Sequence, residues 1–210
     1  MKVLKVSTAI LILSVLSNCY AGSTKDQYAR GKGKWNVQTE QLTAEEQESL
    51  LYMREEEKLA RDVYLTLYEF YESEIFNNIA SGEQKHMDSM KRLLTQFALE
   101  DPVIHDSIGV FTNPEFLEHY ESTGQVETIK DAILPGIIIE ETDIIDIERD
   151  LAFINNPDIK KVYENLLRGS RNHLRAFVRK LESMGIVYQA LVLDQATADA
   201  IVNSPVERGS

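Results

Sequence analysis

The sequence predicts an all-α protein built as a four-helix bundle, and three observations support this fold class. Apolar residues recur at steps of three and four along four long segments, which is the period of an amphipathic helix. Only 5 of the 210 residues are proline and 10 are glycine, so these segments are rarely interrupted. With 43% apolar and 27% charged residues, the composition is that of a globular domain.

Residues 1–21 are predicted to be a signal peptide. Two lysines precede an apolar run at residues 6–16, and Cys19 and Ala21 supply the small side chains that signal peptidase needs at −3 and −1. The run is too short to span a bilayer. We therefore expect an exported protein, periplasmic or secreted; lipid attachment at Cys19 is less favoured because asparagine precedes it. Residues 22–41 predict a flexible leader.

The bundle is predicted to occupy residues 42–185, and its first helix to cover residues 43–72. The capping box Thr43-Ala44-Glu45-Glu46 marks the start of this helix, and neither Gly nor Pro interrupts the rest of it. Its expected inward stripe is Met53, Glu56, Ala60, Val63 and Leu67. Glu56 is the middle residue of three consecutive glutamates, and only the middle one fits this stripe, so its neighbours are expected on a solvated face.

The second helix is predicted to begin at Ser73 and to end before Asp101-Pro102. Its inward stripe contains two ionisable residues among apolar ones, and it consists of Ile79, Glu83, His86, Met90, Leu93 and Phe97. Residues 101–124 contain several Pro and Gly breaks, so we expect an excursion with short helical pieces. This excursion crosses from one helix pair to the other.

The third helix is predicted over residues 126–154, with Pro135-Gly136 near its middle and Glu140 interrupting its apolar stripe. Asn156-Pro157 is a favourable cap and first-turn pair for the fourth helix, which should end at Gly185. The inward stripe of the fourth helix includes His173. Residues 186–210 form a C-terminal tail in which one short helical stretch is expected.

The charge balance restricts the ligands that such a bundle can bind. Asp and Glu number 34 against 22 Lys and Arg, a formal net charge of −12, which disfavours nucleic acid and anionic membranes as partners. Metal ions are the natural alternative. The single cysteine excludes thiolate-rich zinc and iron–sulfur sites. Any metal must therefore be bound by carboxylates and imidazoles.

Ionisable residues in the apolar stripes indicate where that metal would bind. Burying a lone carboxylate costs several kcal/mol unless it is paired or binds a cation. Glu83 and His86 form a Glu-x-x-His step, which places a carboxylate and an imidazole on one helix face. This spacing alone is common. Its conjunction with Glu56, Glu140 and His173 near the middles of the other helices predicts a shared metal site.

Four blocks of the sequence resemble the DUF2202 family of ferritin-like proteins. They are YMREEEKLARDVY at residues 52–64, EQKHMD at 83–88, IEETDI at 139–144 and GSRNHL at 169–174. The resemblance covers about residues 45–184. It implies a ferritin-like four-helix bundle with a crossover excursion between helices two and three. The wider ferritin-like superfamily binds two iron or manganese ions through one Glu from each of two helices and a Glu-x-x-His from each of the others.

Carried over by position, the resemblance implies the ligands Glu56, Glu83, His86, Glu140 and His173. Ser170 stands where the superfamily has a glutamate, so one carboxylate is missing. Asp143, three residues after Glu140, is the expected replacement, and the number of metals, one or two, stays open. Glu57 and Glu141 are adjacent alternatives to Glu56 and Glu140.

The function that this site implies is iron binding with oxidation of Fe(II) by O₂ or peroxide, manganese being the alternative metal. The competing class is a non-catalytic module. It would be a metal-binding or carrier protein, or a structural bundle whose buried acids are satisfied by Arg54, Arg175 and tyrosine hydroxyls. The expected partners are metal ions, and a homodimer is an open alternative.

Overall fold

The computed structural model describes residues 42–123 and 126–209, and within these ranges all regular secondary structure is helical. The predicted signal peptide and leader lie outside the described residues. The helices are α1 (Ala44–Tyr71), α2 (Glu74–Gln96), α3 (Pro114–Thr123), α4 (Ile129–Leu151), α5 (Pro157–Ser183) and α6 (Gln195–Val202). The predicted all-α fold class is confirmed.

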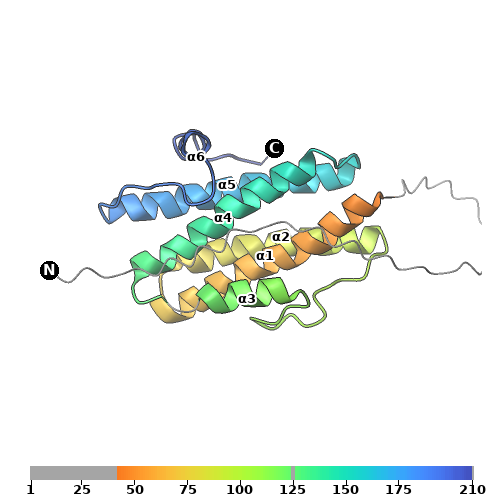
Figure 1. Cartoon of the computed structure of the whole chain (residues 1–210), viewed down its shortest axis with the longest axis horizontal. Helices are drawn as coiled ribbons and strands as arrows, with labels where there is room; N and C mark the ends of the chain where they lie inside the picture. Colours follow the sequence, from red (N-terminus) through yellow and green to blue (C-terminus); the bar gives the residue numbers. More distant parts are fainter. Residues whose placement is uncertain (1–41, 124–125, 210) are drawn as a thin grey trace, which may run out of the picture. The chain divides into compact units, whose positions relative to one another are not determined.

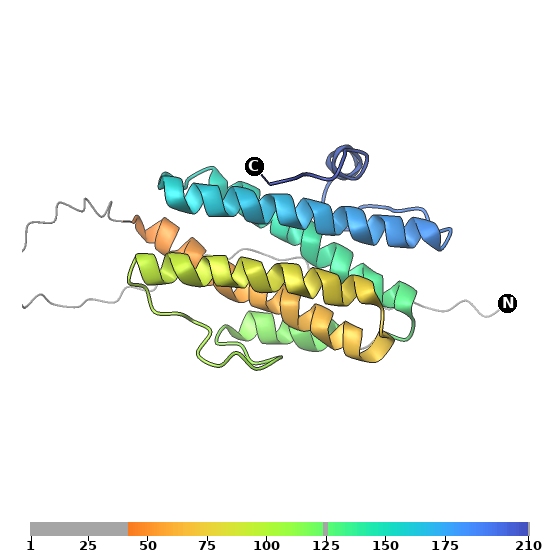
Figure 2. The ribbon, with the colours of Figure 1, turned by 180° about the vertical axis from the view of Figure 1, so that it is seen from behind.

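The four long helices pack as two pairs around one core. α1 packs along α2 and α4 along α5, while α2 faces α5 and α1 faces α4 (Figure 1). α3 contacts α1 on the side away from α4 and α5, and α6 packs on α5 (Figure 2). Residues 97–128, which include α3, connect the two pairs as the predicted crossover.

Local capping explains where the helices begin. The Thr43 hydroxyl accepts a hydrogen bond from the Glu46 amide at 3.1 Å, and the Glu46 carboxylate accepts from the Thr43 amide at 3.0 Å. Asn156 caps α5 by accepting from the amides of residues 158 and 159. α2 ends earlier than predicted, at Gln96, because Ala98 adopts a left-handed conformation with φ of 56°.

α1 differs from the amphipathic helix that its sequence predicts, because residues 53–64 are buried without interruption. The expectation that the neighbours of Glu56 lie on a solvated face is wrong. The crossover segment and α3 cover the outer side of α1, so this helix has no solvent-facing side along that stretch.

Charged side chains on the outer side of α1 attach it to the crossover segment. Arg54 donates to both oxygens of Asp101, at 3.0 and 3.1 Å. The remaining contacts are Glu55 with the amides of Thr112 and Asn113, Lys58 with the Ser107 carbonyl, Arg61 with Asp106, and Asp62 with the Gly109 amide. These bonds fix the rotation of α1 about its axis and therefore which glutamates point into the bundle.

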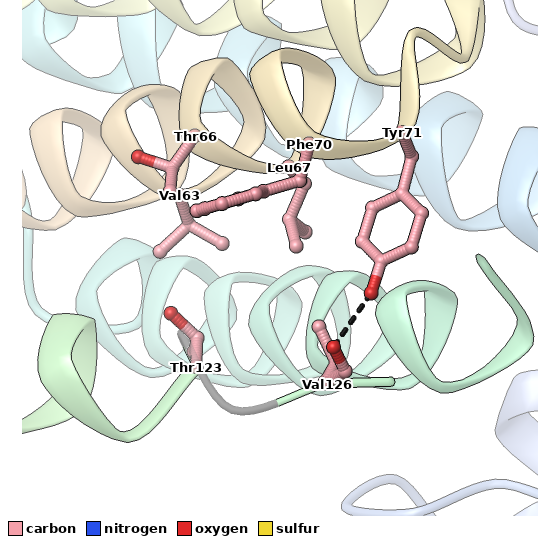
Figure 3. A pocket seen from close by; sticks show the side chains of 7 residues that line it. All are labelled: Val63, Thr66, Leu67, Phe70, Tyr71, Thr123 and Val126. Atoms are coloured by element: carbon pink, nitrogen blue, oxygen red, sulfur yellow. Dashed lines mark hydrogen bonds between the residues drawn. The ribbon is translucent and has the colours of Figure 1, made fainter. Parts of the chain in front are cut away.

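A small pocket lies at the C-terminal end of α1, away from the acidic stripes. It is lined by Val63, Thr66, Leu67, Phe70, Tyr71, Thr123 and Val126 (Figure 3). The Tyr71 hydroxyl donates to the Val126 carbonyl at 2.7 Å across it. The lining contains no acid or histidine. Among the described residues, no helix is both long and apolar enough to cross a membrane.

Removing the carboxylate of Asp62 should strongly destabilise the domain. Asp62 and Lys58 form a fully buried ion pair, so Asp62→Ala leaves a buried ammonium group without its counter-ion. We expect a loss of about 3–5 kcal/mol in the free energy of unfolding, measured by urea denaturation. Asp106→Ala is the control, because 57% of the Asp106 side chain is exposed, and it should cost about 1 kcal/mol or less. Equal losses would contradict this account.

Candidate metal centre

Three acids and two histidines from four helices meet in the middle of the bundle. They form two groups, Glu57 with Glu83 and His86, and Glu83 with Glu140 and His173. In each group, one potential ligand atom per residue lies within 4.8 Å of the others. α1 supplies Glu57, α2 supplies Glu83 and His86, α4 supplies Glu140 and α5 supplies His173. Glu83 belongs to both groups.

The two oxygens of Glu83 face different imidazoles. Oε2 of Glu83 lies 2.7 Å from Nδ1 of His86, and Oε1 lies 2.7 Å from Nδ1 of His173. Each imidazole also approaches a second acid, with His86 at 3.1 Å from Glu57 and His173 at 3.5 Å from Glu140. The carboxylate of Glu83 therefore lies between the two groups, where it can bridge two ions.

The buried side-chain atoms without a hydrogen-bond partner in the described residues gather in and beside these groups. They are Glu56 Oε2, Glu57 Oε1, both oxygens of Glu83, Glu140 Oε2, Asp143 Oδ2, Asp146 Oδ2 and His173 Nδ1. Both oxygens of Glu83 therefore lie close to imidazole nitrogens, but neither contact has the angles of a hydrogen bond. Short oxygen–nitrogen contacts with poor hydrogen-bond angles are expected where the lone pairs of both atoms point toward one bound cation.

Buried acids elsewhere in the domain are well satisfied, which makes this region distinct. Glu141 accepts hydrogen bonds from the Tyr188 hydroxyl and from three successive amides, of Leu191, Val192 and Leu193. Glu46 accepts from the amides of residues 43, 155 and 156. The fold supplies donors where a buried acid has a structural role, and it supplies too few in the centre of the bundle.

The surroundings of the centre favour the neutral forms of Glu57 and Glu140 and the ionised form of Glu83. Burial raises the pKa of Glu57 and of Glu140 to about 7, against the opposing effect of the adjacent imidazoles. The pKa of Glu83 is lowered, because His173 and His86 together outweigh its burial. Burial lowers the pKa of His86, but the charges of Glu57 and Glu83 have the larger effect and raise this pKa to about 10. The centre therefore holds protons that a metal ion would displace.

Tyr64 orients one of the acids. Its ring is fully buried and lies 5.5 Å from that of Phe177, centroid to centroid, as expected for a core residue. Its hydroxyl also donates to Oε1 of Glu140 at 2.6 Å. This bond leaves Oε2 of Glu140, the oxygen that faces His173, without a protein partner.

Two glycines make room for the histidines. A Cβ at Gly82 would lie 2.7 Å from Nε2 of His173, and one at Gly169 would lie 2.4 Å from Nε2 of His86. Each ring therefore lies against the backbone of the opposite helix. Each glycine precedes its own histidine by four residues, so the pattern Gly-x-x-x-His occurs in both α2 and α5. This shared spacing is a sequence signal for the close approach of the two helices.

The structure brings together four of the six predicted ligands, Glu83, His86, Glu140 and His173. Glu56 belongs to neither group; one of its oxygens has no hydrogen-bond partner, and burial followed by the charge of Asp146 raises its pKa well above the ordinary value. Glu57, the adjacent alternative, joins the first group. Successive residues of a helix differ by about 100° in direction, so Glu57 faces α2 while Glu56 faces α4.

Two other predicted positions lie beside the groups. Asp143 is buried but belongs to neither group, and its Oδ2 has no partner. The Ser170 hydroxyl donates to the Leu166 carbonyl at 3.2 Å, so its hydrogen bond is directed along its own helix. Glu141, the alternative to Glu140, instead accepts hydrogen bonds from Tyr188 and Val192 of the C-terminal tail.

Comparison with known proteins identifies the relatives of this chain. The family model of the uncharacterized protein domain DUF2202 matches residues 46–205. The chain is 49% identical to protein MJ0754 of Methanocaldococcus jannaschii over 170 residues, which are 80% of this chain and 92% of that protein. The crystal structure of hypothetical protein MJ0754 is similar, with a TM-score of 0.77 and 44% identity. That match covers 89% of this chain and 100% of the solved one.

The metal-free domain should lose stability as the pH rises. Glu57 and Glu140 have folded pKa values of about 7, above the 4.5 of an ordinary glutamate. Because these two groups hold their protons more tightly in the folded state, they contribute to the free energy of unfolding. This contribution is complete below about pH 4.5 and is lost as the pH rises through about 7. His86, with its raised pKa, contributes in the same direction at higher pH. In the presence of a chelator, urea denaturation should show a lower free energy of unfolding at about pH 8 than at about pH 5.5. A flat or rising profile would contradict the assignment.

A methyl group at Gly169 should displace His86 while leaving the domain folded. The atoms it would meet belong to the end of the His86 ring, which can rotate away. We expect Gly169→Ala to weaken Co(II) binding by about tenfold or more, measured by the visible absorption of the bound ion. Ser81→Ala, at an exposed position of α2, is the control and should bind as the wild type does. Unchanged binding by Gly169→Ala would show that the ring position is unimportant.

Proposed function

The chain belongs to the DUF2202 family, and we propose that its bundle binds two iron or manganese ions and oxidises Fe(II) with O₂ or peroxide. One observation carries this proposal. Buried carboxylates and imidazoles without adequate protein partners converge in two groups that share Glu83. Such groups are costly to bury unless cations compensate them.

The residues fit two metal ions. Glu57 and His86 would bind one ion, Glu140 and His173 the other, and Glu83 would bridge them. Carboxylate oxygens and imidazole nitrogens suit iron and manganese, and the groups contain no thiolate to favour softer metals. Two divalent ions would neutralise the three carboxylates, leaving a small positive excess that the nearby Asp143 can offset.

The chemistry follows from this ligand set. Bound Fe(II) would supply the electrons that O₂ or peroxide takes up, and oxygen-rich ligands would favour the more highly charged Fe(III) product. Glu83 would offer one carboxylate oxygen to each of the two groups. Tyr64 holds Glu140 in place through its hydrogen bond, and the glycines on the opposite helices position both imidazoles.

The purely structural alternative has little support from the contacts of the domain. Arg54 is bonded to Asp101 and Arg175 to Glu207, so neither arginine neutralises the central acids. Among tyrosines, Tyr64 donates to one of them. Together with the contact between Glu57 and His86, this hydroxyl still leaves both oxygens of Glu83 without a hydrogen-bond partner. The metal-carrier alternative differs from the proposal only in lacking the oxidation step.

Export forms a further part of the proposal. It rests on the charged start, apolar run and small cleavage-site residues of residues 1–21. Mass spectrometry of protein recovered from the periplasm or the medium should show a chain that begins at Gly22. Retention of the intact chain in the cytoplasm would contradict export without affecting the metal site.

The metal count of single variants should reveal which acid is shared. We expect about two ions per wild-type chain after anaerobic loading with Fe(II) and desalting. Glu83→Gln removes a ligand from both groups and should lose both ions, whereas Glu57→Gln should lose about one. Glu56→Gln is the matched control for the adjacent position and should retain both. If Glu56→Gln lost metal and Glu57→Gln did not, the helix register of the site would be wrong.

Oxidation can be tested separately from binding. Adding Fe(II) to the wild-type protein in air should produce O₂ consumption and Fe(III) absorption faster than in buffer alone. Glu83→Gln should show only the rate of buffer, because both groups need its carboxylate. Wild-type protein that retains Fe(II) without accelerating its oxidation would establish the carrier alternative instead.

A further inference from the structure

The C-terminal tail, residues 186–209, is bound to the two helices that complete the second metal group. That group is Glu83 with Glu140 and His173, of which α4 supplies Glu140 and α5 supplies His173. The tail lies on the side of α5 away from α2, and its helix α6 packs on α5 (Figure 2). Within the described ranges, its hydrogen bonds to the bundle all go to α4 and α5, and not to α1 or α2, which supply the first group.

Three side chains next to His173 bind the end of the tail. Arg171 donates to both oxygens of Glu207, at 2.8 and 2.6 Å. The side-chain amide of Asn172 donates to the Glu207 carbonyl at 2.9 Å and accepts from the Glu207 amide at 3.0 Å. Arg175 also donates to Glu207, at 2.8 Å. Because these side chains lie within two positions of His173, their bonds fix the rotation of α5 at the point where His173 projects.

Arg175 has the most buried of these three side chains, with 2% of it exposed. Besides Glu207, it donates to the Ile201 carbonyl at 2.9 Å and to the Ser204 hydroxyl at 2.6 Å. A buried guanidinium without partners is strongly unfavourable. This part of α5 therefore cannot turn without breaking several contacts with the tail at once.

The middle of the tail binds α4 beside Glu140. The fully buried carboxylate of Glu141 accepts from the Tyr188 hydroxyl at 2.6 Å and from the amides of Leu191 and Leu193, each at 2.9 Å. Successive amides that converge on one carboxylate hold it in a single orientation. Since Glu141 directly follows Glu140 in the same helix, fixing the direction of one residue fixes that of the other.

We propose that the C-terminal tail is a positioning element for the second metal group, in which Glu207 acts through His173 and Glu141 acts through Glu140. The inference rests on the proposed function, because the ion that it concerns is one of the two proposed above. Each group then has its own support, since the crossover segment holds α1 with Glu57 and the tail holds α4 and α5. Metal ligands whose directions are fixed in advance bind their ion more tightly.

Removing the carboxylate of Glu207 tests this role. Co(II) titration of the mature protein, followed by visible absorption, should give two ions in the wild type. Glu207→Ala should raise the Kd of one of them by about tenfold or more. Glu182→Ala removes an exposed acid at the end of α5 and is the matched control, with both Kd values changed by less than about twofold.

Thermal melting would verify that the Glu207 variant is folded. Should it fail to fold, Arg171→Gln removes the same ion pair at a side chain that is 23% exposed, and it leaves Arg175 with its partners. Arg171→Gln should weaken the same ion. Unchanged Co(II) affinity in a folded variant would overturn the proposal.

Two backgrounds assign the affected ion. In Glu57→Gln the remaining ion belongs to the second group, and adding Glu207→Ala should weaken its binding by about tenfold or more. In Glu140→Gln the remaining ion belongs to the first group, and adding Glu207→Ala should change its affinity by less than about twofold. Equal weakening in both backgrounds would overturn the proposal, because the tail would then be a general cover of the bundle.

A measurement on metal-free protein distinguishes failure of this proposal from failure of the proposed function. NMR signals of ¹⁵N-labelled histidine rings, assigned with His86→Gln and His173→Gln, report the surroundings of each ring. Glu207→Ala should shift the signals of His173 by more than those of His86, whose helix has no hydrogen bond to the tail among the described residues. If this shift is seen in a protein that binds no metal, the tail positions His173 and the metal proposal fails. Absent or equal shifts would overturn the positioning role at any metal count.

Discussion

The structure depends on one constraint, the free energy of burying carboxylates that the protein itself does not satisfy. Six acids around the middle of α1, α2 and α4 have unpartnered oxygens, and each would cost several kcal/mol as an isolated ion. Without a cation, the domain meets this cost by keeping protons, which is why the pKa values of Glu57 and Glu140 rise to about 7. A cation would compensate the same acids at neutral pH, so its binding would also stabilise the fold.

The rest of the domain keeps that unfavourable arrangement in place. α1 is held on its outer side by buried ion pairs and hydrogen bonds to the crossover segment, so it cannot rotate to bring its acids toward water. The three consecutive glutamates then have three different surroundings. Glu55 accepts from crossover amides, Glu56 keeps one buried oxygen without a partner, and Glu57 approaches His86. A helix with one solvated side could not fix these directions as firmly.

The fold and four of the five residues in the two groups follow from patterns in the sequence. Helical periodicity and the caps at Thr43 and Asn156 define α1 and α5, and the Glu-x-x-His step of α2 identifies Glu83 and His86. The choice between Glu56 and Glu57 could not be made locally. It depends on what covers the outer face of α1, and that cover comes from residues about fifty positions away in the chain. The matching Gly-x-x-x-His spacings, in contrast, were available in the sequence.

The fourth position of the ligand pattern shows how charge is distributed in this bundle. At Ser170 a hydroxyl bonded to its own helix replaces the glutamate that the superfamily pattern would place opposite Glu83. The central groups therefore share one carboxylate rather than two. α4 carries two further buried acids, Asp143 and Asp146, each with one oxygen that lacks a hydrogen-bond partner. A centre with a single bridging acid would bind two ions less strongly than one with two, and the further buried acids of α4 add negative potential that attracts cations.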